Sequence, residues 1–315
     1  MSSPGMTTLV IGGTGHIGRF LVRQLIDEGH HVTVVSSGRT AFDSEALAGR
    51  ADFAAMPYDE MLADGRFDAL LAEKKPDAVV DILQRDAPGM QRACETAEVG
   101  HLVFCGSLWM LGRPKIVPTP EFRRTECPFN GYRQRYEQLN EALGKSRADG
   151  LAVSAVLPPN ICGPGKVPLE GMGGRSIEVH RAHQQGKEVT LPFPGTNLIG
   201  PCDAWDVARG FACVLRNREA SAGEAFNVGS AYALTSEQFI NTYAAIHGTK
   251  IPIRTVGPET YIRDVSPHIG AHYHFTEHMC PDISKISERL GYRPAYTPEE
   301  TMARAVAWMK DVKLL

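Results

Sequence analysis

The sequence predicts an α/β fold with a doubly wound parallel sheet and a smaller C-terminal lobe. Short apolar runs of strand length alternate with helical stretches through the first half of the chain. Such alternation is the pattern of βαβ units joined by right-handed crossovers. The first apolar run ends at three glycines spaced three apart, Gly12, Gly15 and Gly18, and an amphipathic helix follows at once. Strand, glycine turn and helix in this order predict a Rossmann-type sheet.

Seven apolar or β-branched runs are expected to form the sheet. In chain order they cover residues 9–11, 31–35, 53–56, 78–82, 102–105, 151–157 and 225–228. Residues 158–200 are rich in Pro and Gly, which predicts loops and turns that line a cleft. Helical patterns are expected at about residues 132–145, 203–216, 236–247 and 298–311, with a strand at 251–256. Residues 1–5 have the composition of a loose leader.

The glycine turn has the features that a pyrophosphate group requires. Gly12 permits a tight turn, Gly15 keeps a Cβ out of the path of the phosphates, and Gly18 allows close packing of the helix. The helix N-terminus adds unpaired N–H groups and a positive dipole end. A glycine turn without a ligand is the alternative interpretation. The residues predicted to bind a dinucleotide are Gly12, Thr14, Gly15, His16, Ile17 and Gly18, with Leu83 just after a later strand.

The end of the second strand indicates which dinucleotide binds. A carboxylate at this position would bind the ribose 2′-hydroxyl of NAD. The chain instead has Ser36, Ser37 and Arg39. The two hydroxyls can donate hydrogen bonds and Arg39 can pair with a 2′-phosphate, so the sequence favours NADP, with NAD as the alternative. An ordinary surface position for Arg39 is the competing interpretation.

The composition limits the kinds of partner. A net charge of −3 and a pI of about 6.4 give no support for nucleic acid or an anionic membrane, which leaves a small-molecule substrate. No apolar stretch has the length of a membrane span, and the seven cysteines contain no Cys-x-x-Cys pair. We therefore expect reduced thiols and a cytoplasmic protein. The expected units are a dinucleotide-binding domain from residues 1–157 with 201–230, and a substrate-binding lobe from residues 158–200 with 231–315.

Several further segments carry a likeness to a known family. They are residues 104–112 (Phe-Cys-Gly-Ser-Leu-Trp-Met-Leu-Gly), 128–132 (Pro-Phe-Asn-Gly-Tyr), 157–165 (Leu-Pro-Pro-Asn-Ile-Cys-Gly-Pro-Gly) and 226–229 (Phe-Asn-Val-Gly). Together with the glycine turn, they resemble the extended and atypical short-chain dehydrogenase/reductases, the NAD(P)-dependent epimerase/dehydratase group. The resemblance implies a catalytic hydroxyl at Ser107 and a catalytic tyrosine at Tyr132. The resemblance also implies a homodimer, and by fold position alone it implies substrate contacts from residues 166–175.

One position departs from the family pattern. The family has a lysine four residues after the tyrosine, where it holds the nicotinamide ribose and lowers the pKa of the phenol through its charge. Tyr136 occupies that position here, and Arg133 and Arg135 are predicted to point off that helical face. A free phenol has a pKa of about 10, so an unassisted tyrosine is a poor base near neutrality. The catalytic candidates are Ser107, Tyr132 and Tyr136.

These residues leave more than one class of function open. The leading hypothesis is an NADP-dependent oxidoreductase or epimerase/dehydratase that acts on a hydroxyl or ketone of a small polar molecule, such as a sugar or nucleotide sugar. The alternatives are a dinucleotide-binding sensor with little catalysis and a non-redox enzyme that uses the same cleft. The pair of Ser107 and Tyr132 favours the first hypothesis, and Tyr136 favours the alternatives.

A histidine-rich segment near the C-terminus raises the question of a metal. Its members are His268, His272, His274 and His278, with Cys280 close behind. Imidazole and thiolate groups are zinc ligands, but this spacing matches no metal-binding signature. His272 and His274 alternate as on a strand. We therefore predict no metal site, and substrate contacts or surface positions for these imidazoles.

Overall fold

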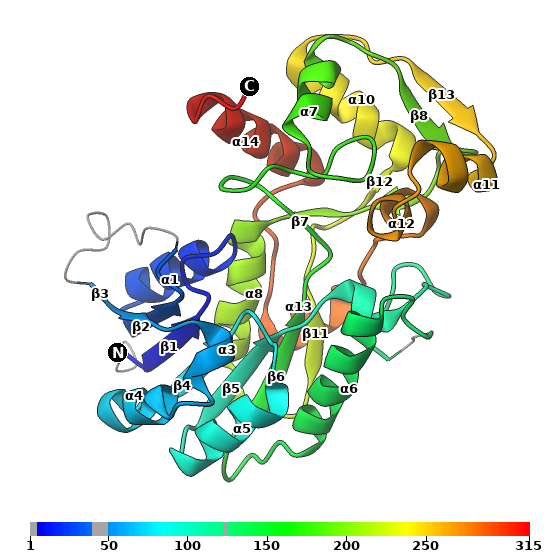
Figure 1. The fold of residues 1–315 in the computed structure, drawn as a ribbon. Helices are drawn as coiled ribbons and strands as arrows, with labels where there is room; N and C mark the ends of the chain where they lie inside the picture. The colour runs from blue at the N-terminus through cyan, green and yellow to red at the C-terminus, as the bar shows by residue number, and fades with distance from the viewer. Residues whose placement is uncertain (1–4, 40–49, 123–124) are drawn as a thin grey trace.

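A seven-stranded parallel sheet forms the centre of the structure (Figure 1). The computed structural model describes residues 5–39, 50–122 and 125–315, so most of the expected leader lies outside the described residues. The strand order is β11-β6-β5-β4-β1-β2-β3, and all neighbours pair in parallel. The order 3-2-1-4-5-6 is that of a Rossmann sheet, with β11 added at the edge, so the predicted fold class is confirmed. The strands are β1 (Thr7–Ile11), β2 (His31–Ser36), β3 (Ala51–Ala55), β4 (Ala78–Asp81), β5 (His101–Cys105), β6 (Ala152–Leu157) and β11 (Ala225–Asn227).

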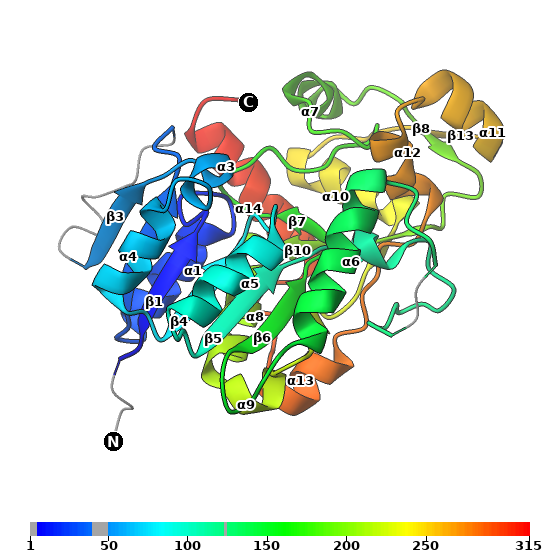
Figure 2. The ribbon, with the colours of Figure 1, turned by 60° about the horizontal axis from the view of Figure 1, so that its bottom comes forward.

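Different helices cover the two faces of the sheet (Figure 2). Successive side chains of a strand point to opposite faces, so Leu9 packs in one core and Val10 in the other. The core around Leu9 includes residues of α4, α5 and α6, and the core around Val10 includes residues of α1, α8 and α13. These helices are α1 (Gly18–Asp27), α4 (Arg66–Lys74), α5 (Ala87–Thr96), α6 (Asn130–Gly144), α8 (Ala204–Arg216) and α13 (Ser284–Leu290).

A third hydrophobic core lies apart from the sheet. It contains Leu191, Phe239 and Met302, and its elements gather beyond one end of the strands (Figure 1). The small strands here pair as β7 with β10, β8 with β13, and β9 with β12. The predicted residue boundaries between the two units stay a prediction. The remaining elements are α3 (Tyr58–Met61), η1 (Leu108–Leu111), β7 (Asn160–Cys162), α7 (Ile177–Gln184), β8 (Val189–Pro192), β9 (Leu198–Ile199), β10 (Pro201–Asp203), α9 (Arg218–Ser221), β12 (Leu234–Thr235), α10 (Ser236–His247), β13 (Ile253–Val256), α11 (Pro258–Thr260), η2 (Tyr261–Val265), α12 (Ile269–Thr276) and α14 (Pro298–Asp311).

The structure corrects two local expectations. The segment of 158–200 is not only loops, because it contains the helix α7, in which His180 and His183 are buried. The alternation of His272 and His274 suggested a strand. This expectation is wrong, because both residues lie in the helix α12. Tertiary packing explains this helix, since it has no side-chain cap and buries Tyr273 and Phe275.

The last helix follows the sequence pattern closely. α14 spans the predicted residues 298–311, and its start is fixed by a capping box. Thr297 accepts a hydrogen bond from the backbone N–H of Glu300, whose carboxylate in turn accepts one from the backbone N–H of Thr297.

The seven cysteines are all free and buried. Within the described ranges, no helix combines the length and the apolar character that a membrane crossing needs.

Candidate active site

The glycine turn lies at the carboxyl end of β1, where it leads into α1. Gly12 has a φ of 80°, which favours glycine, and its N–H donates to the carbonyl oxygen of Val35 in β2 at 2.8 Å. A side chain at Gly18 would collide with the carbonyl oxygen of Gly12. No side chain of the described chain caps α1, and its first turn contains no acidic residue. The positive dipole end of α1 is therefore not neutralised by a described side chain, and the turn fits the pyrophosphate of a dinucleotide.

The residues predicted to select the dinucleotide lie beside this turn. Strands β1 and β2 run in parallel register, with Ile11 opposite Val35, so the end of β2 adjoins the glycine turn. The hydroxyl oxygen of Ser36 accepts from the N–H of Gly38 at 3.3 Å, and Ser37 accepts from the N–H of Arg39 at 3.5 Å. The side chain of Arg39 is exposed. This is the place from which the ribose of a dinucleotide is contacted in Rossmann folds.

A buried carboxylate shapes the turn that contains Leu83. Oδ1 of Asp81, at the end of β4, accepts from the N–H groups of Leu83 at 2.9 Å and Gln84 at 2.8 Å. Its Oδ2 accepts from the hydroxyl of Tyr58 at 2.6 Å. Burial raises the pKa of Asp81, and these three donors oppose that rise. A Cβ built on Gly12 would lie 3.3 Å from Cγ of Leu83, so the predicted Leu83 borders the glycine turn.

The predicted catalytic groups Ser107 and Tyr132 share one neighbourhood, which is centred on Trp109. Ser107 follows β5 and caps η1, because its hydroxyl oxygen accepts from the N–H of Trp109 at 3.3 Å. Tyr132 lies near the start of α6, and its ring centroid is 6.0 Å from that of Trp109. Phe129 stacks on Trp109 at 4.7 Å. The serine and the tyrosine are both half-buried.

The charged neighbours of Tyr132 differ from the sequence expectation. Tyr136 is half-buried and packs against the core around Leu9. Nη1 of Arg133 pairs with Oε1 of Glu126 at 2.6 Å. The expectation for Arg135 is wrong, because its guanidinium carbon lies 5.6 Å from the centroid of the Tyr132 ring. The guanidinium of Arg135 donates to the backbone carbonyl oxygens of Gln84 and Leu83, which follow β4, and it lies over the phenol ring.

Positive charge gathers on the other side of the glycine turn. A Cβ built on Gly165 would lie 2.9 Å from Nη1 of Arg19, so the loop after β7 lies on the side chain of Arg19. Burial and the charges of Arg175, Lys166 and Arg19 lower the pKa of His16 to about 4. His16 is therefore neutral near pH 7. Thr14 is half-buried and Ile17 packs in the core around Val10.

The hydrogen-bond acceptors of Arg175 among the described residues are all neutral, and the charge of Glu170 acts on it without a hydrogen bond. Its guanidinium donates to the carbonyl oxygens of Val167 at 2.7 Å and Ile161 at 2.9 Å, and to Oδ1 of Asn160 at 3.3 Å. Burial lowers the pKa of Arg175, and burial together with Arg175 lowers the pKa of Lys166. A desolvated cation that has no carboxylate in hydrogen-bond contact favours an anionic ligand. The sequence named this loop only by its fold position, and no local pattern singles out Arg175.

The histidines of the C-terminal segment have separate surroundings. Nδ1 of His272 lies 2.9 Å from the carbonyl oxygen of Ser266, and Nδ1 of His278 accepts from the N–H of Leu198 at 3.1 Å. The ring of His274 lies 4.8 Å from that of Trp109, and burial lowers the pKa of His274 to about 3. His274 thus joins the neighbourhood of Ser107. Across the described ranges, no three His, Cys, Asp or Glu side chains come together as metal ligands.

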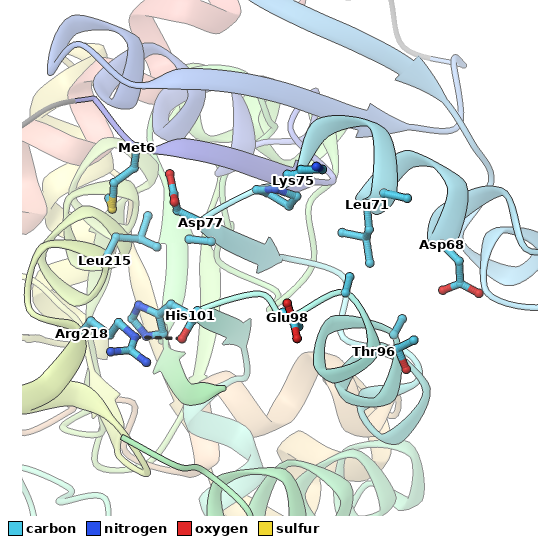
Figure 3. Close-up of a pocket in the computed structure, with 16 residues that line it drawn as sticks. Met6, Asp68, Leu71, Lys75, Asp77, Thr96, Glu98, His101, Leu215 and Arg218 are labelled. Atoms are coloured by element: carbon cyan, nitrogen blue, oxygen red, sulfur yellow. Dashed lines mark hydrogen bonds between the residues drawn. The ribbon is translucent and has the colours of Figure 1, made fainter. Parts of the chain in front are cut away.

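A separate cavity of about 740 Å³ lies at the opposite end of the strands (Figure 3). Asp77 and His101, at the amino ends of β4 and β5, line it together with Arg218. Ligands of open α/β sheets bind at the carboxyl ends of the strands. None of the predicted site residues lines this cavity, so it is not the candidate site.

The fold and the glycine turn define an α/β protein with a site for a dinucleotide. The model of the NAD dependent epimerase/dehydratase family matches residues 8–229. The chain belongs to this family, which confirms the resemblance inferred from its motifs.

Individual relatives are distant and match over most of the chain. A UDP-glucose 4-epimerase of Lactobacillus helveticus is 24% identical over 339 residues, which cover 97% of this chain and 98% of that protein. The chloroplast stem-loop binding protein of 41 kDa b of Arabidopsis thaliana is 24% identical and covers 91% of this chain and 75% of that protein. The crystal structure of UDP-glucose-4-epimerase from Stenotrophomonas maltophila, with bound NAD and formylated UDP-arabinopyranose, has a TM-score of 0.74. It is 21% identical and covers 98% of this chain and 99% of that one, so it shows the shared fold.

Proposed function

We propose that this protein is an NADP-linked epimerase, dehydratase or oxidoreductase that acts on a hydroxyl or ketone of a nucleotide sugar. The observation that carries the proposal is the buried guanidinium of Arg175, which the loop after β7 holds and whose charge, after burial, lowers the pKa of both His16 in the glycine turn and His274 beside Trp109. A diphosphate-linked sugar is the ligand whose anionic part fits this pair and whose sugar would reach Ser107 and Tyr132. The named relatives that bind or act on UDP-sugars support the same substrate class.

The choice of NADP depends on the end of β2. Arg39 is exposed beside the glycine turn, where its guanidinium can pair with a 2′-phosphate in two hydrogen bonds. The Stenotrophomonas structure contains NAD, so NAD is the competing cofactor. A bound nicotinamide dinucleotide supplies the hydride acceptor and donor of the reaction.

The protein groups would bind, orient and move protons. Ser107 donates its hydroxyl hydrogen to the substrate oxygen, because its own oxygen already accepts from Trp109. Tyr132 exchanges a proton with the same substrate oxygen. Arg175 and Lys166 hold the phosphates of the substrate, and the rings of Trp109 and Phe129 exclude water beside the reacting carbon.

Two measurements test the proposal. Calorimetry with NADP⁺ and NAD⁺ measures which dinucleotide binds, and a panel of UDP- and dTDP-sugars with sugar-product chromatography measures turnover. We expect Tyr132→Phe to lose about 10²-fold or more in kcat. Arg175→Met should raise KM for the nucleotide sugar, whereas the exposed Arg181→Met, whose charge is paired with Glu178, is the matched control.

Other outcomes would favour the alternative functions. Tight dinucleotide binding without turnover on the panel supports a redox sensor, and Tyr136 in place of a lysine is the feature that favours it. Unchanged turnover in Tyr132→Phe removes Tyr132 from the mechanism, and turnover that needs no dinucleotide supports a non-redox enzyme. The homodimer inferred from the family stays a prediction, and light scattering of the purified protein measures it.

A further inference from the structure

We propose that Arg135 is the positioning residue of Tyr132, and that it couples the phenol ring to the bound dinucleotide through the turn of Leu83 and Gln84. The inference rests on the proposed function for the dinucleotide and for the role of Tyr132. It assigns a role to a residue that the sequence pattern placed away from the site.

Three hydrogen bonds join Arg135 to Gln84, and a fourth joins Arg135 to Leu83. Nε of Arg135 donates to the carbonyl oxygen of Gln84 at 2.9 Å and to its Oε1 at 3.1 Å. Nη2 donates to the carbonyl oxygen of Leu83 at 3.0 Å, and Nε2 of Gln84 donates back to the carbonyl oxygen of Arg135 at 3.0 Å. The planar guanidinium reaches two successive carbonyls at once, which a lysine ammonium on a flexible chain cannot reproduce. These hydrogen bonds of Arg135 with Leu83 and Gln84, here called the clasp, therefore fix α6 relative to the turn after β4.

The turn itself is held firmly on its other side. Gln84 is fully buried and has a φ of 43°, a conformation that a residue with a side chain adopts only when its surroundings impose it. Its N–H is fixed by the buried carboxylate of Asp81 at 2.8 Å. The neighbouring Leu83 packs against Gly12 of the glycine turn. This turn thus contacts the glycine turn through Leu83, and it contacts Arg135 through both Leu83 and Gln84.

The other end of this connection is the phenol ring. The guanidinium carbon lies 5.6 Å from the centroid of Tyr132. A cation over a ring face attracts the ring and so fixes its position. The adjacent Arg133 cannot take this role, because it pairs with Glu126 at 2.6 Å and donates to the carbonyl oxygen of Cys127 at 3.2 Å. A displacement of Leu83 by a bound dinucleotide would therefore reach Tyr132 through Arg135.

The test follows the environment of Tyr132 directly, without a substrate. The nine tyrosines are replaced by 3-fluorotyrosine, and the ¹⁹F resonance of Tyr132 is assigned by its loss in Tyr132→Phe. Spectra are recorded with and without NADP⁺ for Arg135→Met, Arg135→Lys and Gln84→Asn. Arg133→Met is the matched control, because it removes a neighbouring arginine of the same helix that does not lie over the ring.

We expect Arg135→Met to move the Tyr132 resonance in the cofactor-free protein and to abolish its further shift on addition of NADP⁺. By reciprocity of the coupling, the Kd for NADP⁺ should rise about fivefold or more. Arg135→Lys keeps the charge and should restore the cofactor-free resonance, but not the response to NADP⁺. Gln84→Asn shortens one arm of the clasp, tolerates the positive φ, and should weaken the response even if Arg135→Met fails to fold.

An unchanged Tyr132 resonance in Arg135→Met overturns the inference, as does an equal shift in Arg133→Met. An NADP⁺ response that persists in both Arg135→Met and Gln84→Asn overturns the coupling. If the parent protein binds no dinucleotide, the proposed function and the coupling fail together, and the cofactor-free spectra still decide whether Arg135 positions the ring. A failure of the proposed function is thus distinguishable from a failure of the positioning role of Arg135.

Discussion

The hydroxyl of Tyr58 donates to Oδ2 of the fully buried Asp81 at 2.6 Å, and this bond joins the segment after β3 to the end of β4. The same hydroxyl oxygen accepts from the N–H groups of Arg85 and Asp86, both at 3.3 Å. A buried carboxylate is costly unless donors satisfy it. This tyrosine is therefore a structural support of the turn that borders the cofactor loop.

Removal of that hydroxyl should destabilise the protein. Tyr58→Phe leaves Oδ2 of Asp81 without its donor in a buried position, and we expect a loss of about 1–3 kcal/mol in the free energy of unfolding. Urea denaturation measures it. Tyr232→Phe is the control, because the exposed Tyr232 makes a similar bond to Glu299 at 2.8 Å and should change stability by less than about 0.5 kcal/mol. Equal losses in the two variants would contradict the role of burial.

The glycine turn gives a second prediction, on dinucleotide affinity. Gly18→Ala places a Cβ against the carbonyl oxygen of Gly12, so the turn must open and affinity for NADP⁺ should fall by about tenfold or more. Calorimetry measures the affinity. Gly29→Ala is the control, because Gly29 has a φ of 90°, which strains any side chain, but has no atom within 4 Å of the added Cβ. It should lower stability and leave NADP⁺ affinity unchanged, and equal affinity in both variants would remove the turn from the binding site.

The third prediction concerns the choice between NADP and NAD. Arg39→Ala removes the guanidinium beside the glycine turn, and affinity for NADP⁺ relative to NAD⁺ should fall by about tenfold. Competition calorimetry with the two dinucleotides gives this ratio. Arg50→Ala is the control, because Arg50 is exposed and pairs with Asp27 at 3.0 Å. If the ratio stays the same in Arg39→Ala, then Arg39 is a surface cation.

Much of the fold was predictable because its signals are local. A strand, three spaced glycines and an amphipathic helix occur within residues 7–27, and the capping box of α14 lies within four residues. The positions of Ser107 after a strand and Tyr132 at the start of a helix also follow from local patterns. The seven-stranded sheet is the sum of such local units.

The missed features depend on contacts between distant segments. Tyr58 and Asp81 are 23 residues apart, and Arg135 meets Gln84 across 51 residues. A helical-wheel argument places Arg135 off the tyrosine face, but a long side chain can return to that face when backbone carbonyls hold its end. The alternation of His272 and His274 covers too few positions to distinguish a strand from the helix that forms.

The last prediction concerns acid stability and the buried imidazoles of α7 and α10. His180 and His183 lie with their ring centroids 5.6 Å apart, and Tyr243 is 5.2 Å from each. Burial lowers the pKa of His183 from 6.5 to about 3 and that of His180 to about 4, and each further cation nearby, including His247, adds to the effect. The folded state then binds fewer protons than the unfolded chain between these values and pH 6.5. The contribution of these neutral histidines to the free energy of unfolding is therefore fully present above pH 6.5. It is lost as the pH falls from 6.5 toward 3.

His183→Leu tests this assignment. Neither buried ring nitrogen of His183 has a hydrogen-bond partner among the described residues, so an apolar side chain of similar volume should be neutral or stabilising at pH 7.5. At pH 5 the free energy of unfolding of the variant should exceed that of the parent by about 1–2 kcal/mol more than it does at pH 7.5. The reason is that the variant has no imidazole at position 183 to protonate on unfolding. Thermal denaturation at the two pH values measures the difference. The exposed His31→Gln is the control, and a pH dependence of His183→Leu equal to that of the parent would show that other groups cause the acid sensitivity.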